Sequence, residues 1–366
     1  MTLSVTLSHA FPGFTLDAAF EAPAGITVLF GRSGSGKTTV ANAVAGLLRP
    51  DAGRIALDDV VLSDSARGVW LPPHRRRLGY IFQEGRLFPH LTVRQNLTYG
   101  RRFAPRGQRS DRVGHVVEML GIGPLLDRRP GALSGGEKQR VGIGRALLAS
   151  PRLILADEPL AALDDARKAE VLPYFERLRD EVAVPILYVS HSVAEVARLA
   201  TSVVVLEDGQ VVRHGSVRDV LGDSSVTPLG AREAGALIEA RVVAHAADGL
   251  TELRAGDISL FLPRIAHPPG SAVRLRIAAH DVTLSTVAPV GQSALNILPG
   301  HVTGIRPGDG PGAIVSLDTS AGTILARITR RSVATLGLDA GMPCHAIVKS
   351  VAIAPQDIGR QPGGPT

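Results

Sequence analysis

The chain has a single cysteine, few aromatic residues and no long apolar run. Cys344 is the only cysteine among 366 residues, which excludes an intramolecular disulfide and a cysteine-based zinc site. Aromatic residues make up 4% of the sequence, and no apolar run approaches the ~20 residues that a membrane-spanning helix needs. The first residues also lack the basic-then-apolar layout of a signal peptide. These absences predict a cytosolic chain.

The charge balance is basic, but its pattern does not favour nucleic acid as a partner. The sequence has 40 Lys and Arg against 34 Asp and Glu, a formal net charge of +6. The basic residues form short clusters at 74–77 and 101–102 without interleaved aromatics, which favours a surface that faces solvent or another subunit. With 45% hydrophobic residues, a chain of this length is expected to fold into two or three domains.

Residues 31–38 fit the phosphate-binding loop pattern G-x-x-x-x-G-K-[ST]. The apolar run at 26–30 predicts a buried strand before the loop, and residues 39–45 predict a helix after it. Glycines in this context let backbone N–H groups converge on phosphate oxygens at a helix N-terminus. The alternative is a glycine-rich turn between two core elements, which the motifs further along disfavour. The predicted nucleotide-binding residues are Gly31, Arg32, Ser33, Gly34, Ser35, Gly36, Lys37, Thr38 and Thr39, with Lys37 for the β- and γ-phosphates and Thr38 for Mg²⁺.

A second glycine-rich helix start lies at 133–140, with the sequence LSGGEKQR. Ser134 supplies a hydroxyl, and Gly135 and Gly136 leave backbone N–H groups accessible, which again suits an anion. One nucleotide does not need two such cradles from the same subunit. Two subunits paired head to tail would each close a cradle over the nucleotide of the other.

Two acidic residues end the apolar run at 153–156. Because consecutive strand residues point to opposite faces, Asp157 and Glu158 are expected to have different roles. We assign Asp157 to the Mg²⁺ shell and Glu158 to the base that orients and deprotonates an attacking water. His191 and Gln83 each end another predicted strand, at the edge of a parallel sheet where ligands bind. A lone histidine there is commonly structural, but we favour a contact from His191 to the γ-phosphate.

The composition changes in the last third of the chain. From about residue 236 helical patterns vanish, and short alternating strands separated by Pro- and Gly-rich turns follow, which predicts a small all-β barrel region of OB type. The expected parts are an α/β domain at 1–230, a β-rich connecting segment at 231–290, a β domain at 291–356 and a disordered tail at 357–366.

The motifs together resemble the ATPase subunits of ABC transporters. The phosphate loop, the strand-end glutamine, the LSGGEKQR signature, the acid pair and the histidine occur in the order typical of that family, over residues 1–225. The resemblance implies an α/β P-loop NTPase domain of the ABC ATPase type, with ATP and Mg²⁺ as cofactors. The tyrosine that commonly stacks on adenine in this family has no clear counterpart, and Phe11 and Phe14 are candidates for its role.

The same resemblance implies further roles for individual residues. Gln83 belongs to the loop that senses Mg²⁺ and the transmembrane subunit. Ser134 and Gly136 bind the γ-phosphate held by the partner subunit, Asp164 lies at the dimer contact, and His191 is the switch histidine.

The C-terminal part resembles the molybdate-binding "Mop" version of the TOBE domain, a small all-β OB-like fold. The stretches at 293–302, 326–329 and 348–350 carry this resemblance, and 80–90 and 187–192 are similar to the ATPases of molybdate importers. In such domains a tetrahedral oxyanion is held by main-chain N–H groups with serine and lysine side chains. The implied oxyanion-binding residues are Ser293, Ala294, Asn296, Ser332, Lys349 and Ser350.

The resemblance implies an assembly and a place in the cell. It predicts a homodimer on the cytoplasmic face of the membrane, beneath transmembrane permease subunits served by a periplasmic or extracellular solute-binding protein. Molybdate or tungstate is the expected cargo and a possible regulatory ligand of the β domain, and a purely dimerising role for that domain is the alternative. Sulfate, iron or another solute is the alternative cargo. A soluble ABC ATPase acting on DNA or ribosomes would instead be expected to have a second cassette or a long coiled-coil insertion, and the sequence contains neither.

Overall fold

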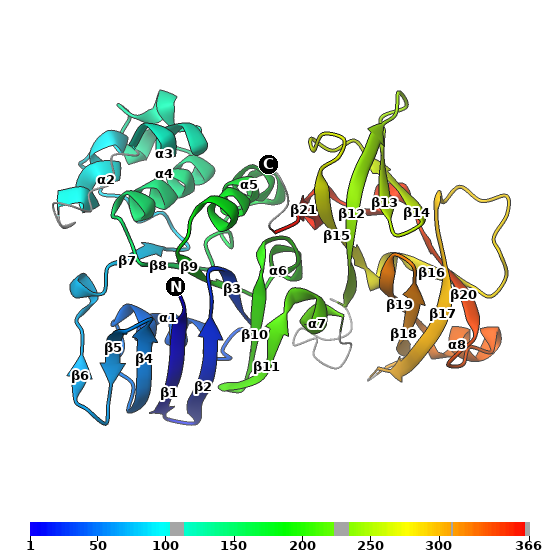
Figure 1. Ribbon diagram of the computed structural model, residues 1–366, viewed down its shortest axis with the longest axis horizontal. Coiled ribbons are helices and arrows are strands. Elements are labelled where there is room, and N and C mark those ends of the chain that lie inside the picture. Colours follow the sequence, from blue (N-terminus) through cyan, green and yellow to red (C-terminus); the bar gives the residue numbers. More distant parts are fainter. Residues whose placement is uncertain (103–112, 223–233, 309, 363–366) are drawn as a thin grey trace. The chain divides into compact units, whose positions relative to one another are not determined.

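The computed structural model describes four stretches of the chain, residues 1–102, 113–222, 234–308 and 310–362. The chain forms two compact units, unit 1 with residues 1–192 and 199–215, and unit 2 with residues 193–198 and 216–366 (Figure 1). The domain boundary expected at residue 230 lies outside the described residues. No helix in the described stretches is long and apolar enough to cross a membrane.

Unit 1 is built around a sheet of eleven strands, in the order β6-β5-β4-β1-β2-β11-β10-β3-β9-β8-β7. The strands are β1 (Leu3–Phe11), β2 (Phe14–Ala22), β3 (Gly25–Phe30), β4 (Ala52–Leu57), β5 (Val60–Asp64), β6 (Val69–Trp70), β7 (Leu78–Ile81), β8 (Leu153–Asp157), β9 (Pro185–Ser190), β10 (Ser202–Glu207) and β11 (Gln210–Ser216). The β1, β2, β4, β5 and β6 strands pair antiparallel, whereas β10, β3, β9, β8 and β7 form a parallel half. The carboxyl ends of the parallel strands therefore meet at one edge, where ligands of such sheets bind.

Helices cover the parallel half on both faces, which explains its continuous apolar runs. Every residue of β3 and β9 is buried. Leu187 and Val189 of β9 join a core cluster with Val40 of α1, whereas Tyr188 between them meets Phe175 of α5 edge to face, with ring centroids 5.3 Å apart. The α-helices in the described stretches are α1 (Lys37–Ala45), α2 (Val93–Tyr99), α3 (Val113–Met119), α4 (Gly135–Leu148), α5 (Asp165–Glu181), α6 (Val193–Leu199), α7 (Val217–Leu221) and α8 (Arg330–Leu336).

Unit 2 contains two five-stranded antiparallel sheets, in the orders β14-β13-β12-β15-β21 and β16-β20-β17-β18-β19. Their strands are β12 (Gly235–His245), β13 (Leu250–Ala255), β14 (Ile258–Pro263), β15 (Ala272–Ala278), β16 (Val282–Ser285), β17 (Asn296–Pro307), β18 (Gly312–Thr319), β19 (Gly322–Thr329), β20 (Pro343–Val348) and β21 (Ile358–Arg360). One hydrophobic cluster includes Ile238 and Leu260 from the first sheet and Leu298 and Val315 from the second. The expected order of an α/β domain and then an all-β domain is confirmed. The separation at 290/291 stays a prediction, and the shared core ties its two sides together.

The tail expected to be disordered at 357–366 is partly ordered. Ile358 is buried and pairs with Leu275 as β21 adds to the edge of β15. Asp357 accepts from Arg276 at 3.2 Å. The Pro- and Gly-rich composition that suggested disorder begins only at residue 362, and residues 363–366 lie outside the described part. An apolar side chain and an ion pair therefore hold the stretch just before it.

Candidate functional site

The phosphate loop joins β3 to α1 and requires glycine at two positions. Gly36 precedes α1 with φ 101°, and a Cβ there would lie 2.9 Å from Leu16 Cδ1 and 3.3 Å from Phe14 Cζ. A Cβ on Gly31 would collide with the carbonyl oxygen of Leu206. The loop backbone is therefore packed against β2 and β10 on its inner side, which leaves its outer side for a ligand.

Lys37 is folded back onto the loop that precedes it. Its Nζ donates to Gly31 O at 2.9 Å and to Arg32 O at 2.7 Å, and the residue is 4% exposed. Burial lowers the pKa of Lys37, while the carboxylates of Glu158 and Asp157 act in the opposite direction. A buried cation whose hydrogen bonds go to neutral carbonyl oxygens gains strongly from an anion, so Lys37 suits phosphate.

The loop also holds a hydroxyl that its own atoms do not satisfy. Within the described residues, the buried Oγ of Ser35 has no hydrogen-bond partner. Buried polar groups are nearly always paired, so an orphan hydroxyl in a glycine-rich loop is a place for a ligand oxygen. A triphosphate fits this loop.

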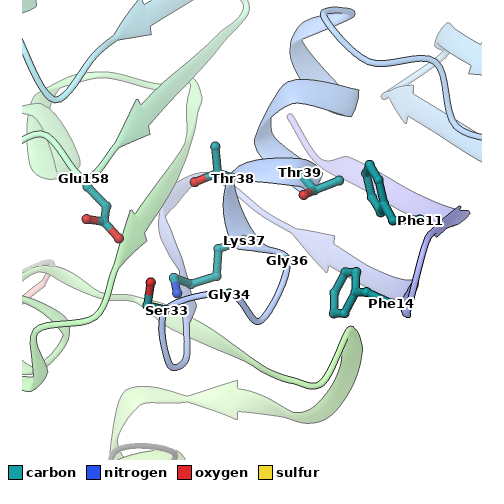
Figure 2. Close-up of a pocket in the computed structure, with 9 residues that line it drawn as sticks. All are labelled: Phe11, Phe14, Ser33, Gly34, Gly36, Lys37, Thr38, Thr39 and Glu158. Carbon is teal, nitrogen blue, oxygen red and sulfur yellow. The ribbon is translucent and has the colours of Figure 1, made fainter.

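A pocket of about 310 Å³ opens over the loop (Figure 2). Its lining residues are Phe11, Phe14, Ser33, Gly34, Gly36, Lys37, Thr38, Thr39 and Glu158. The two aromatic rings stand at one end with centroids 6.2 Å apart, and Glu158 stands at the other, across the loop. An aromatic end for a base and a polar end for phosphate suit a nucleotide in this orientation. Phe11 and Phe14 both border the pocket, so both remain candidates for stacking on the base.

The Asp157 carboxylate accepts hydrogen bonds from the hydroxyl groups of Thr38 in α1 and Tyr80 in β7. Thr38 Oγ1 donates to its Oδ1 at 3.2 Å, and the hydroxyl of Tyr80 donates to its Oδ2 at 3.3 Å. Burial raises the pKa of Asp157, an effect partly offset by the two hydrogen bonds. Burial and the nearby Asp157 carboxylate raise the pKa of Tyr80, which keeps its hydroxyl a donor.

These oxygen atoms suit Mg²⁺, which is usually bound by one or two carboxylates together with substrate phosphates and water. Among the described residues, no cluster of three or more His, Cys, Asp or Glu could hold a metal unaided. Thr38 and Asp157 thus fit the Mg²⁺-binding role expected from the sequence. The nucleotide would supply the remaining ligands of the metal. Sequence reasoning missed Tyr80, although its place near the end of the strand beside β8 was a usable signal.

Glu158 and His191 come together at the end of the sheet. His191 Nδ1 lies 3.2 Å from Glu158 Oε1, and the Glu158 N–H donates to Val189 O at 3.1 Å. Glu158 has φ 44°, in the left-handed region that non-glycine residues rarely occupy. Backbone strain of this kind is concentrated at functional sites, where it aims a side chain.

Gln83 lies outside the pocket over the phosphate loop. β7 ends at Ile81, two residues before Gln83, which was expected to end this strand, and Gln83 is exposed. Its side chain borders a second pocket, of about 430 Å³, together with Gly135 and Leu163. The contact of Gln83 with Mg²⁺ stays a prediction.

The signature residues do not reach the phosphate loop of their own chain. Ser134 caps α4 by accepting from Glu137 N at 3.3 Å, and Asp164 caps α5 by accepting from Arg167 N at 2.9 Å. The signature residues Ser134, Gly135 and Gly136 do not line the phosphate-loop pocket, and neither does Asp164. The structure thus brings together the phosphate loop, Asp157, Glu158 and His191 and leaves the second anion cradle free.

The six residues implied in oxyanion binding are divided between two places in unit 2. Four of them lie close to the start of β17, because Asn296 in β17 pairs with Val348 of β20. These four are Ala294 and Asn296 on the β17 side, and Lys349 and Ser350, which follow Val348. Asn296 is buried with its amide committed, because Oδ1 accepts from Phe261 N at 2.6 Å and Nδ2 donates to Phe261 O at 2.9 Å.

The remaining two residues differ in position. Ser293 is exposed in the segment that precedes β17, whereas Ser332 is in the first turn of α8, where its N–H donates to Thr329 Oγ1 at 3.0 Å. Thr329 pairs with Gly312, beside the far end of β17. Ser332 therefore does not join the others within one chain.

A phosphate loop facing two strand-end acids, followed by an all-β unit, defines an ATPase of the ABC type. A family model described as ABC transporter matches residues 17–161, and one described as TOBE domain matches residues 292–355. The molybdenum import ATP-binding protein ModC of Rhizobium meliloti (strain 1021) is 55% identical over 355 residues, 96% of this chain and 99% of that protein. The ModC protein of Paramagnetospirillum magneticum is 50% identical over 347 residues, 94% of this chain and 96% of its own. The chain belongs to this family of molybdenum import ATP-binding proteins.

Solved structures share the fold of the ATP-binding part. The structure of cbiO1 from Clostridium perfringens, part of an ABC transporter complex, superposes with a TM-score of 0.51 at 26% identity and covers 61% of this chain and 92% of its own. The dimeric bacterial ABC transporter cassette MJ0796 gives a TM-score of 0.50 at 26% identity, with 59% of this chain and 99% of its own covered. Membership of an ATP-binding family implies that the chain uses a nucleotide.

Proposed function

We propose that the chain is the ATP-hydrolysing subunit of an importer that takes up molybdate. The observation that carries the proposal is the pocket in which Lys37 and Thr38 face Glu158 across a glycine-rich loop. The cargo rests on membership of a family whose curated relatives are named for molybdenum import. The reaction is ATP plus water to ADP and phosphate.

The residues that hold the nucleotide are those of the loop and the neighbouring strand end. Loop N–H groups and Ser35 bind phosphate oxygens, and Lys37 exchanges its two carbonyl contacts for the β- and γ-phosphates. Thr38 and Asp157 are the residues that would hold Mg²⁺. When bound there, Mg²⁺ would neutralise charge on the phosphate oxygens.

Glu158 is the base for the attacking water. Glu158 lines the nucleotide pocket at the end opposite the aromatic rings. Its carboxylate would therefore lie beside the phosphates of a nucleotide whose adenine ring stacks on Phe11 or Phe14. His191 lies 3.2 Å from this carboxylate and orients it. When ATP is bound, His191 would also contact the γ-phosphate. A base in this position contributes roughly 10²–10⁴ in rate.

The functional unit is a homodimer with two composite sites. The signature helix start is exposed at Ser134, and the phosphate-loop pocket has no residue from it, so each site lacks a second anion cradle until a partner provides one. The dimeric form of a structural relative supports this pairing. Asp164, exposed at the start of α5, belongs to the same contact.

The dimer works beneath transmembrane permease subunits on the cytoplasmic face of the membrane, and a solute-binding protein outside delivers the cargo. This placement follows from the import function of the curated relatives. Tungstate, which has the same charge and tetrahedral shape as molybdate, is the alternative cargo.

Transport in proteoliposomes tests the proposal. Vesicles containing the chain with its permease subunits and binding protein should accumulate labelled molybdate only with ATP, and Lys37→Ala should abolish both uptake and hydrolysis. A tenfold excess of sulfate should leave molybdate uptake nearly unchanged. Uptake of sulfate in preference to molybdate would overturn the cargo, and ATP hydrolysis that never drives uptake of any oxyanion would overturn the transport role.

We also propose that unit 2 binds molybdate or tungstate as a regulatory ligand near the start of β17. Two features support a site there: the buried Oγ of Ser350 has no partner among the described residues, and the neighbouring Lys349 is exposed. A hydroxyl donor and a cation suit a tetrahedral dianion. Regulation requires a different affinity in the open and closed dimers, since equal affinity shifts nothing.

Calorimetry on the full chain tests this second site. The Lys37→Ala variant serves as the background because its phosphate loop no longer competes for the anion. Molybdate should release heat in this background, and a further Lys349→Ala or Ser350→Ala change should weaken its binding at least about tenfold, as expected for the loss of a charge-assisted hydrogen bond. Absence of heat up to millimolar molybdate would leave unit 2 with a structural role.

A further inference from the structure

The segment that carries Gln83 is held against one face of the signature helix α4. Gln139 Nε2 donates to Phe82 O at 3.2 Å. Arg145 donates from one guanidinium nitrogen to Arg86 O at 2.9 Å and from the other to Gly85 O at 3.3 Å. Backbone carbonyls on both sides of Gln83 are thus bonded to side chains of a single helix.

The segment that carries Gln83 packs closely against the backbone of α4. A Cβ added to Gly85 would lie 2.9 Å from Lys138 O, and one added to Gly142 would lie 3.5 Å from Gly85 O. Residues 138, 142 and 145 of α4 follow the i, i+4, i+7 spacing of one helical face. The segment therefore lies on a stripe of α4 where Gly85 of the segment and Gly142 of the helix permit the close approach and Arg145 holds it by hydrogen bonds.

The charged guanidinium of Arg145 is used in this contact. Burial lowers the pKa of its guanidinium, which also lies over the ring of Phe88 at 5.4 Å. The two hydrogen bonds of this guanidinium go to the carbonyl oxygens of residues 85 and 86. Burial of a cation is unfavourable, and the two charge-assisted hydrogen bonds to carbonyl groups offset this cost. They hold the segment of residues 82–86 in a defined position on α4.

The same segment reaches the metal-site carboxylate on its other side. The ring of Phe82 stacks on Tyr80 at 4.1 Å, and the Arg86 guanidinium lies 4.5 Å from the Phe82 centroid. Tyr80 in turn donates to Asp157. Contacts therefore run from Asp157 through Tyr80 and Phe82 to Gln139 of α4, and Gln83 follows Phe82 directly in the chain. Figure 1 shows α4 among the helices beside β7.

We propose that Arg145 is a positioning residue for Gln83: it fastens the segment of residues 82–86 to α4, so that Gln83 and the signature start at Ser134 move as one body. A partner's nucleotide that engages Ser134 would thereby also set the place of Gln83 in the chain's own site. The inference rests on the proposed function and on the Mg²⁺-sensing role that the family resemblance implies for Gln83.

A double-mutant cycle on ATP hydrolysis by the full chain tests the proposal. Gln83→Ala and Arg145→Ala should each lower kcat by about 10- to 100-fold, since a misplacement of ~1 Å can cost on the order of 100-fold, and each should change KM for ATP less than about twofold. The double variant should be no slower than the slower single variant within about twofold, because Arg145 acts through Gln83. Effects that multiply, or an Arg145→Ala variant with normal kcat, would overturn the proposal.

A matched control and two milder variants separate positioning from folding. Arg177 of α5 also donates to a backbone carbonyl, Met119 O at 3.1 Å, but away from Gln83, so Arg177→Ala should leave kcat within about twofold and multiply with Gln83→Ala. If Arg145→Ala does not fold, Arg145→Lys and Gln139→Leu replace it, because each removes part of the contact with residues 82–86. Each should lower kcat on its own but should not lower it further in the Gln83→Ala background. Normal hydrolysis by Gln83→Ala would refute the assigned role of Gln83 and the inference with it, whereas a slow Gln83→Ala with multiplying effects refutes the inference alone.

Discussion

The Nδ1 atom of His191 lies 3.2 Å from the Oε1 atom of Glu158, although 33 residues separate them in sequence. The contact exists because β8 and β9 are parallel neighbours, so the residues that follow them meet at one edge of the sheet. The N–H of Glu158 also donates to Val189 O, which fixes the turn that holds the carboxylate. Histidine and carboxylate are therefore placed by backbone pairing before any nucleotide binds.

Replacement of Glu158 by Gln should stop hydrolysis and leave ATP binding intact. The amide keeps the shape of the carboxylate and its approach to His191 but cannot accept a proton. The expected loss in steady-state phosphate release is roughly 10²-fold or more at saturating ATP. The variant should elute as a closed dimer with ATP in gel filtration. Turnover within about twofold of the unchanged protein would refute the general-base assignment.

Replacement of Ser134 by Arg should abolish hydrolysis without weakening nucleotide binding to the monomer. Ser134 is exposed at the start of α4 and lies outside the phosphate-loop pocket, so a bulky cation there blocks closure over the partner's nucleotide. A mixture of this variant with Lys37→Ala forms dimers with one intact composite site and should recover part of the activity. If the mixture stays inactive while crosslinking shows mixed dimers, one composite site is insufficient. Failure to form mixed dimers at all would count against pairing in trans.

Replacement of Asp157 by Asn should stabilise the protein at neutral pH when nucleotide and Mg²⁺ are absent. Burial raises the pKa of Asp157 in the folded state. A raised carboxyl pKa contributes stability below the unfolded pKa, and that contribution is lost as pH rises through the folded pKa. The Asn variant should therefore melt at a higher temperature than the unchanged protein at pH 8, with a smaller difference at pH 5. Asp127→Asn, at a carboxylate 90% exposed, is the control and should change little. A lower melting temperature for Asp157→Asn at pH 8 would contradict the prediction.

Replacement of Arg76 by Met should weaken the fold around the helix that follows the phosphate loop. Arg76 is 2% exposed and donates to Ala43 O at 2.7 Å and Val44 O at 2.8 Å, near the carbonyl end of α1. It also donates to Leu71 O at 2.7 Å, and burial lowers the pKa of Arg76 to about 10. Loss of three charge-assisted bonds should cost about 2–4 kcal/mol in the free energy of unfolding, measured by urea denaturation.

Two further variants define the origin of this loss. Arg76→Lys should be nearly as unstable, because a single ammonium cannot span the carbonyl groups of both segments. Arg75→Met, at an exposed neighbour, should change stability by less than about 0.5 kcal/mol. An Arg76→Met protein as stable as the Arg75→Met protein would rule out the role assigned to the buried guanidinium.

The sequence by itself was sufficient for the features that depend on short spacing. The phosphate loop, the signature start at Ser134 and the acids at 157 and 158 are local patterns, because the chemistry of a helix N-terminus or a strand end is built from adjacent residues. The change from helical to strand patterns also predicted the all-β unit, since hydrophobic period follows secondary structure directly. Asp157 beside Thr38 followed once both were assigned to the same sheet edge.

Only the tertiary structure decided which distant residues meet. The contacts of Tyr80 with Asp157 and of Arg145 with the carbonyls beside Gln83 depend on strand order and helix packing, which no local pattern encodes. In unit 2, the packing of one sheet on the other brings the Asn296 amide to the backbone of Phe261, and strand pairing orders Ile358 in a tail that composition alone assigned to disorder. A buried hydrogen bond or a strand edge is satisfied by whichever group the fold brings within reach, so its partner is a property of the whole chain.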